Sequence, residues 1–298
     1  MKSFLYLLLV CLSALSAHAD MWTLSLPETG ILPCYTKATY LSRMHERHGG
    51  SHLGMQDYTI SFPFTDPSRS YIGTWRYFIQ GNAAVSIIDA GGPELDLKKN
   101  ELMVMSLPVS FIKTISPSER LTCTFIPRFA GDGLNSSHTW DLPILLDYRI
   151  THSPALTYSL GLAASPRFAV YGVLPYVSFS WQATPEWLLR LSGYELAALY
   201  RVNERLHIGP ALSMEGGTWM VVTPQGQRIF RMRSLALTLL TEYNFAPAGK
   251  TKRLLRAEIG STLASTAQFC KRNARKDPVE THHYKPGLLL SVAVDFRF

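Results

Sequence analysis

The sequence of 298 residues has little charge, few cysteines and no long apolar run. Only 17% of its residues are charged and 47% are hydrophobic, whereas average globular proteins carry roughly 25% charge. This balance excludes an intrinsically disordered chain and a coiled coil. No apolar run reaches the roughly 18 residues that indicate a membrane-spanning helix, so a helical membrane protein is excluded as well. The remaining classes are a soluble β-rich protein and a membrane-spanning β-barrel.

The cysteines do not form a disulfide framework. Besides Cys11 near the N-terminus, the chain has Cys34, Cys123 and Cys270, which are odd in number and far apart, whereas such frameworks use an even, clustered set. We interpret them as small apolar residues, and the alternative is a single disulfide between Cys34 and Cys270.

The net charge of +7 comes from basic residues scattered along the chain, and it predicts no nucleic-acid partner.

The first nineteen residues have the pattern of a secretory signal peptide. Lys2 supplies a positive start, residues 4–15 form an apolar core, and Ala17-His18-Ala19 is a small-x-small cleavage site. We therefore expect residues 1–19 to be removed. Residues 20–298 show no linker or repeat and are predicted to form one domain.

Apolar and polar residues alternate through the rest of the chain, which is typical of strands with one apolar face. The clearest run is 288–298, and similar runs cover 119–129, 139–151 and 205–217. Each spans about 9–13 residues, whereas soluble strands average about 5–6 and membrane-crossing strands need about 9–11. An open sheet edge cannot lie in lipid, so this pattern favours a membrane barrel. A soluble sandwich or barrel is the alternative.

Connections of two kinds separate the predicted strands. Short turns near 116–118, 152–154, 184–185, 203–204 and 246–252 alternate with longer polar segments at 130–139, 165–171, 217–228 and 270–281. Outer-membrane barrels have short turns on one side and longer loops on the other. The pattern predicts about twelve strands, near 71–89, 101–114, 119–129, 139–151, 155–164, 172–183, 186–193, 195–202, 205–217, 229–245, 253–269 and 282–298. Two weaker candidates, 35–43 and 56–64, raise the number to fourteen.

The C-terminus carries a family resemblance. Phe298, preceded by Phe296 and Val294, resembles the terminal-strand signature of Gram-negative outer-membrane β-barrel proteins. The resemblance implies an all-β, antiparallel, up-and-down transmembrane barrel in the cell outer membrane. It also implies two partners: the barrel-assembly machinery, which reads the signature in that family, and outer-membrane lipid.

If the apolar positions of such a barrel face lipid, the intervening charged positions face the lumen. We expect Arg231, Arg233 and Arg256 to share one wall and to make the lumen mildly selective for anions. Acidic residues would neutralise part of this charge, because unpaired charge in a narrow lumen is costly. The predicted lumen residues are Arg231, Arg233, Arg256, Asp147, Arg149, Glu242 and Glu258.

These residues favour a small-solute channel or a lumen-binding transport protein. The alternative is a plugged barrel whose outer loops contact lipid, glycan or protein. A lipid hydrolase is disfavoured because His152-Ser153 falls in a predicted turn, so no catalytic residue and no cofactor is predicted. The group His45, Glu46, His48 and His52 is rich in metal-ligating residue types, but Gly49-Gly50-Ser51 makes it flexible, and we interpret it as a solvated loop rather than a metal site.

Overall fold

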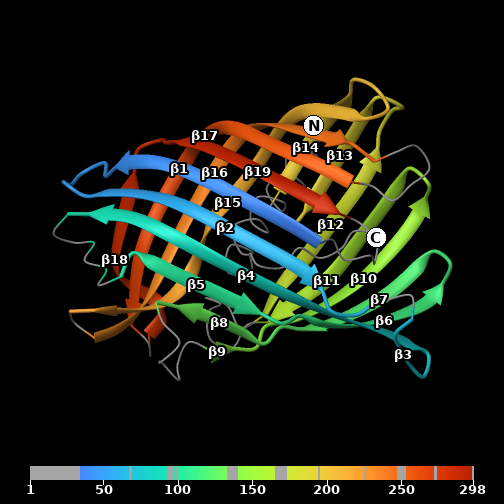
Figure 1. The fold of residues 1–298 in the computed structure, drawn as a ribbon, viewed down its shortest axis with the longest axis horizontal. Coiled ribbons are helices and arrows are strands. Elements are labelled where there is room, and N and C mark those ends of the chain that lie inside the picture. Colours follow the sequence, from blue (N-terminus) through green and yellow to red (C-terminus); the bar gives the residue numbers. More distant parts are fainter. Residues whose placement is uncertain are drawn as a thin grey trace.

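The computed structural model describes residues 34–66, 69–92, 95, 97, 99–132, 140–164, 173–193, 195–224, 226–246, 253–271 and 274–296. In these ranges the chain is almost entirely strand (Figure 1), and no helix there is long and apolar enough to cross a membrane. The strands are β1 (Cys34–His45), β2 (His52–Pro63), β3 (Tyr71–Ile72), β4 (Trp75–Gly91), β5 (Glu101–Ser106), β6 (Val109–Ser116), β7 (Glu119–Phe125), β8 (Arg128–Gly131), β9 (Trp140–Asp141), β10 (Ile144–Ser153), β11 (Leu156–Ala164), β12 (Val173–Gln182), β13 (Trp187–Ser192), β14 (Glu195–Arg201), β15 (Leu206–Thr223), β16 (Gly226–Asn244), β17 (Arg253–Lys271), β18 (Ala274–Tyr284) and β19 (Leu288–Phe296).

These strands form one sheet that closes in a ring of fourteen. Proline has no amide hydrogen and interrupts a ladder. Pro108, Pro127, Pro143 and Pro286 lie in the short gaps of four strand pairs, which are β5/β6, β7/β8, β9/β10 and β18/β19. Each pair therefore occupies one position in the ring, and β3 is a short addition to β4. Antiparallel pairing of β1 with β19 closes the ring.

The fold class is confirmed, but the count of twelve strands is wrong and the alternative of fourteen is right. The two weaker candidates, 35–43 and 56–64, lie in β1 and β2 and pair with each other. A bulge after Leu41 interrupts the regular alternation at the end of the first candidate.

Two predicted loops are also wrong. Residues 217–228 continue β15 and β16 almost to the turn, with pairing that is unbroken from Leu206↔Tyr243 to Thr223↔Gly226. Residues 270–281 lie largely in β17 and β18. The other two predicted loops are 130–139 and 165–171. Residues 133–139 of the first and all of the second are outside the described residues.

Antiparallel pairing sorts the connections to two ends of the barrel, as predicted. The turn end carries the short connections at 117–118, 154–155 and 202–205, together with Cys34 and Phe296. The loop end carries the connections at 46–51 and 92–100 and the tips of β15–β18. Arg253 pairs with Phe296, and Phe296 pairs with Cys34, so these three residues lie side by side at the turn end. Cys270 lies near the loop end, 17 positions further along β17 than Arg253. The barrel length therefore separates Cys34 from Cys270.

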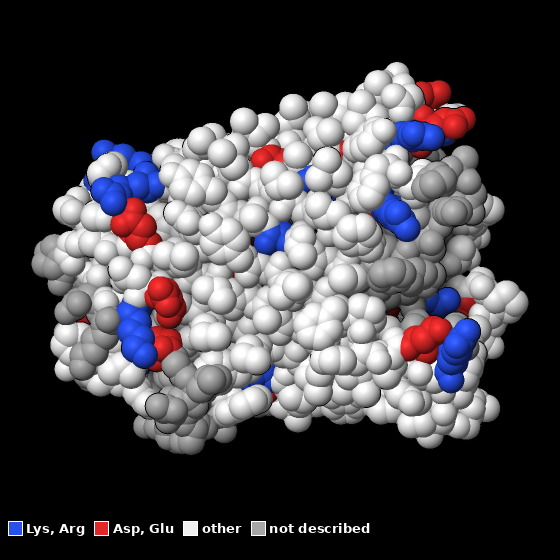
Figure 2. All heavy atoms as spheres, viewed as in Figure 1, with Lys and Arg blue, Asp and Glu red and all other residues white. Residues whose placement is uncertain are grey.

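Large apolar side chains cover the outer surface of the barrel. In Figure 2 charged side chains gather toward the two ends of the molecule and are sparse between them. Trp187 and Tyr200 stack edge to face near the turn end, with ring centroids 5.3 Å apart, where membrane barrels place aromatic girdles. The exposed residues include Tyr40, Ile60, Val85, Leu146, Leu160, Leu162, Leu237, Leu239, Ile259, Leu290 and Val292. These exposed side chains form an apolar belt around the outer surface of the barrel.

A second closure narrows the barrel at the loop end. β15 continues beyond its neighbour β14 and pairs with β8 through Met220↔Gly131. Arg128 Nη2 donates to the Thr218 carbonyl at 3.1 Å, and the backbone amide of Val222 donates to Asp132 Oδ2 at 2.7 Å. The ring formed by β1, β2, β4, β5, β8, β15, β16, β17 and β18/β19 therefore closes on itself without β9–β14.

An apolar cluster fills the interior of this smaller ring. Trp219 stacks on Phe230 with ring centroids 5.9 Å apart, and Leu95 and Leu97 enter from the β4–β5 connection. Its members lie on strands all around the ring, so they can meet only through the interior. They are Leu41, Met44, Leu53, Met55, Ala84, Ile88, Leu95, Leu97, Leu102, Val104, Ala130, Trp219, Val221, Phe230, Met232, Ala236, Ala267, Phe269, Tyr284 and Leu289. We call this set the apolar cluster.

Candidate functional site

The interior between the apolar cluster and the turn end is polar. On β2, β4 and β5 the inward positions change from aliphatic to hydroxyl and amide side chains. Gln80 Nε2 donates to Ser61 Oγ, and Asn82 Nδ2 donates to Ser106 Oγ at 3.3 Å. Strand alternation puts these residues on the same face as the apolar cluster. The barrel thus has an apolar half and a polar half along its axis.

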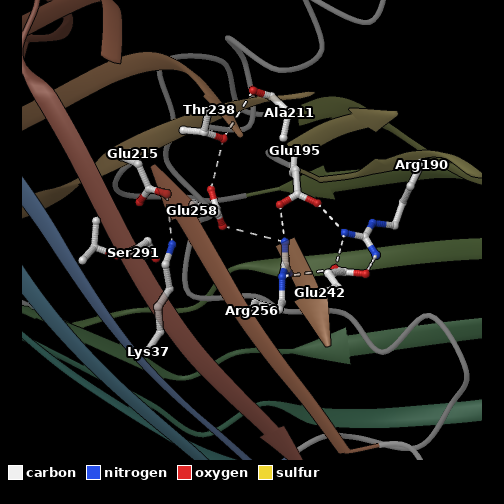
Figure 3. A network of polar contacts seen from close by, with 11 residues as sticks. Lys37, Arg190, Glu195, Ala211, Glu215, Thr238, Glu242, Arg256, Glu258 and Ser291 are labelled. Atoms are coloured by element: carbon white, nitrogen blue, oxygen red, sulfur yellow. Dashed lines mark hydrogen bonds and ion pairs between the residues drawn. The ribbon is translucent and has the colours of Figure 1, made fainter. Parts of the chain in front are cut away.

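Four charged side chains form a network across the polar half (Figure 3). Arg190 of β13 donates to both carboxylate oxygens of Glu242 of β16, at 2.8 and 3.3 Å, and to Glu195 at 2.8 Å. β14 and β15 separate β13 from β16 in the sheet, so the contact with Glu242 crosses the interior. Planar guanidinium groups suit such bidentate contacts with carboxylates.

Arg256 of β17 joins the same carboxylates from the other side. It bonds Glu195, lies 3.2 Å from Glu242 Oε1 and 3.8 Å from Glu258 Oε1. Glu195 and Glu242 are each at most 6% exposed, and each lies between the two arginines. Two arginines and two glutamates balance in charge, which is the arrangement that buried charges need. We call Arg190, Glu195, Glu242 and Arg256 the charge network.

A second ion pair crosses the interior beside the network. Lys37 Nζ of β1 lies 3.0 Å from Glu215 Oε1 of β15, although β16, β17 and β19 separate these strands in the sheet. Glu258 accepts a hydrogen bond from Thr238 at 3.5 Å, and Figure 3 shows it between the Lys37 pair and Arg256. The interior here is only as wide as two side chains laid end to end.

Another charged group lies on the wall made by β7, β10 and β11. Asp147 is buried, and it interacts electrostatically with Arg149 and Arg120. Arg149 Nε also donates to Ser159 Oγ at 3.3 Å. β10 pairs with both β7 and β11, so this group is held by three adjacent strands.

At the loop end, Glu46 anchors the β1–β2 connection to β18. His282 Nδ1 lies 2.9 Å from Glu46 Oε1, Ser51 Oγ donates to Glu46, and the Arg47 amide donates to the His283 carbonyl at 2.8 Å. Burial raises the pKa of Glu46, but the hydrogen bonds of Ser51 and His282 outweigh it and hold the pKa below its ordinary 4.5. Within the described residues, no group of three His, Cys, Asp or Glu side chains has the arrangement of a metal site.

A family model matches the second half of the chain. Residues 148–297, which contain the whole charge network, match the family described as "Domain of unknown function (DUF6268)". The chain belongs to this family. No curated protein matches the sequence.

Several solved structures are similar to this chain at low sequence identity. An outer membrane channel from Pseudomonas putida F1 is 10% identical, with a TM-score of 0.44 over 92% of this chain and 99% of that chain. The KdgM porin is 9% identical, with a TM-score of 0.35 over 89% and 99%. The Pseudomonas putida toluene transporter TodX is 8% identical, with a TM-score of 0.36 over 96% and 93%.

The structure brings only some of the predicted lumen residues together. Arg256, Glu242 and Glu258 lie in or beside the charge network, and Asp147 and Arg149 form the separate group on β10. Arg231 and Arg233 lie nearer the loop end, in the part of β16 that pairs with residues 216–218. Phe230 and Met232 point into the apolar cluster there, so the two arginines lie on the opposite face of the strand and the prediction that they face the lumen is wrong. The eleven positions between Arg231 and Glu242 correspond to about 35 Å along a strand, so the three arginines do not share one constriction.

Sequence reasoning did not select Lys37, Glu195 or Glu215. Lys37 lies in one of the weaker candidate strands, and Glu195 begins a strand directly after a tight turn. The alternation of inward and outward side chains was the available signal, since Glu215 follows the inward positions Ala211 and Ser213. Alternation alone does not reveal that these residues contact partners on distant strands.

Proposed function

We propose that the protein is a narrow channel of the bacterial outer membrane that passes or binds a small polar solute. The observation that carries this proposal is the polar half of the interior, where charged side chains from distant strands face one another inside a lipid-facing ring. A barrel with only a structural role has no need of charges in its lumen, because burying them is costly.

The proposed location has its own support. The signal peptide pattern at 1–19 favours export, and the apolar belt favours insertion into a membrane. Val294 and Phe296 lie on β19, the strand that closes the ring against β1; Phe298 is outside the described residues. We infer that the barrel-assembly machinery engages this strand, and that outer-membrane lipid contacts the belt. Recovery of the protein without detergent, as a soluble periplasmic monomer, would contradict this location.

The apolar cluster supports a second candidate, a closed barrel that acts through its outer surface. Trp219 and Phe230 are at most 2% exposed, and this packing of the interior favours a closed barrel. Conductance of the purified protein in planar lipid bilayers separates the two functions, because a channel gives discrete current steps and a closed barrel gives none.

A variant sharpens this experiment. Trp219→Ala removes the largest fully buried side chain, at a cost of about 3–5 kcal/mol, and should enlarge the current steps. Leu237→Ala on the lipid-facing side is the matched control and should leave them unchanged. Heat-modifiable migration on gels verifies that each variant folds. If the wild type and the folded Trp219→Ala protein both carry no current, the channel function is wrong.

A further inference from the structure

We propose that the lumen selects small cations, and that Lys37 is a tethered ammonium ion at its cation-binding position. The proposal rests on the channel function proposed above and names the charge class of its solute. It reverses the anion preference expected from the sequence, which required Arg231 and Arg233 beside Arg256.

Negative charge is concentrated where Lys37 reaches across the lumen. Its Nζ contacts Glu215 at 3.0 Å, and Glu215 also interacts electrostatically with Glu258 and Asp57. Asp57 accepts hydrogen bonds from Ser86 at 2.6 Å and from Thr59 at 3.0 Å. Asp57 and Glu258 lie in one ladder row with Thr39, which is two residues from Lys37 on the same strand. These three carboxylates and one ammonium group carry a net charge of −2. We call Asp57, Glu215 and Glu258, with Lys37, the carboxylate cluster.

The neighbouring charges do not cancel this excess locally. The charge network contributes two positive and two negative charges and is therefore neutral. The group on β7 and β10 contributes one positive charge in excess, from Arg120 and Arg149 against Asp147, but it is held on another wall. Of these three groups of charges, the carboxylate cluster is therefore the most negative.

Buried hydroxyl groups next to Glu215 provide a second, independent observation. Ser234 stands directly opposite Glu215 in the β15–β16 ladder, Ser265 stands opposite Ser234, and Ser213 is two residues before Glu215. Each is at most 3% exposed, and its Oγ has no hydrogen-bond partner among the described residues. Buried hydroxyls are normally bonded, and leaving one unbonded costs about 1–3 kcal/mol.

Hydroxyl oxygens beside a carboxylate bind cations and the water that hydrates them. Lys37 shows that a primary ammonium group already fits beside Glu215. Because the carboxylates do not form a metal-ligand set in the described residues, the fitting class is a monovalent cation or a small amine rather than a resident divalent metal. The position lies at the floor of the apolar cluster, since Leu41 and Lys37 are on the same face of β1.

The reversal potential across a planar bilayer under a KCl gradient tests the proposal. The wild type should favour K⁺ over Cl⁻. Lys37→Met should raise the permeability ratio about two- to threefold, the effect of one unit charge about 8 Å away in water. Asp57→Asn should lower the ratio by a similar factor. Lys113→Met is the control, because Lys113 faces outward over the Trp75 ring.

The outcomes separate this inference from the channel function itself. A conducting barrel that prefers Cl⁻, or a folded Lys37→Met protein whose ratio equals that of Lys113→Met, overturns the cation site and leaves the channel in place. Absence of current in the wild type and in Trp219→Ala overturns the channel. If Lys37→Met does not fold, Asp57→Asn decides, because an unchanged ratio in that variant refutes the carboxylate cluster.

Discussion

Removal of Arg256 should destabilise the barrel more than removal of any exposed arginine on the same strand. Arg256→Met keeps most of the side-chain volume but leaves Glu195, Glu242 and Glu258 without one cation. Breaking a buried ion pair costs about 3–5 kcal/mol. Arg190 still contacts two of the three carboxylates, at 2.8 Å each, so we expect the lower end, about 3 kcal/mol.

Urea unfolding of the purified barrel in detergent micelles, followed by tryptophan fluorescence, measures this loss. The midpoint should fall while the slope stays constant, which marks a change in stability alone. Arg253→Met is the matched control, because Arg253 lies on the same strand, is exposed, and should change stability by no more than about 0.5 kcal/mol. Adding Glu195→Gln to Arg256→Met should restore part of the loss. Equal midpoints for Arg256→Met and Arg253→Met would refute the reasoning.

Three further predictions concern the loop end and the C-terminus. Gly216→Val should disrupt the tip of β15–β16, because Gly216 has φ +127° and a Cβ there would meet the Met232 carbonyl; limited proteolysis should cleave this variant and spare Gly50→Ala, whose Cβ meets nothing. The contribution of Glu46 to stability is present above pH 4.5 and is lost as the pH falls through its lower folded pKa. The hydrogen-exchange protection of residues 46–51, measured relative to the intrinsic rate at each pH, should therefore fall in acid, and Glu46→Gln should show low protection at both pH values. Deletion of Phe298 should lower the amount of barrel inserted in the membrane, and a normal yield argues against the terminal signature.

The sequence by itself determined which face of most strands points outward. It assigned the wrong face on β16 near the loop end, where Phe230 and Met232 point into the apolar cluster instead of Arg231 and Arg233. Leu288, Leu290 and Val292 are exposed, whereas Ser291 between them is buried. This pattern can be read locally, because successive side chains of a strand point to opposite faces whatever the rest of the chain does. Alternation failed at residues 218–221 and 229–232, where both faces are buried. The sequence pattern suggested a loop for the first of these segments and a strand for the second.

Only the tertiary structure decided which inward residues meet. Lys37 and Glu215 lie 178 positions apart, and their contact depends on the strand number, on the register of every intervening pair and on how β15 turns toward β8. Alternation fixes a face but not the partner across the lumen, because the partner is set by the stagger at which the ring closes. The same closure puts Trp219 inside the smaller ring, with Arg231 far from Arg256. The charge selectivity of the lumen therefore follows from the closed barrel and not from the list of its charged residues.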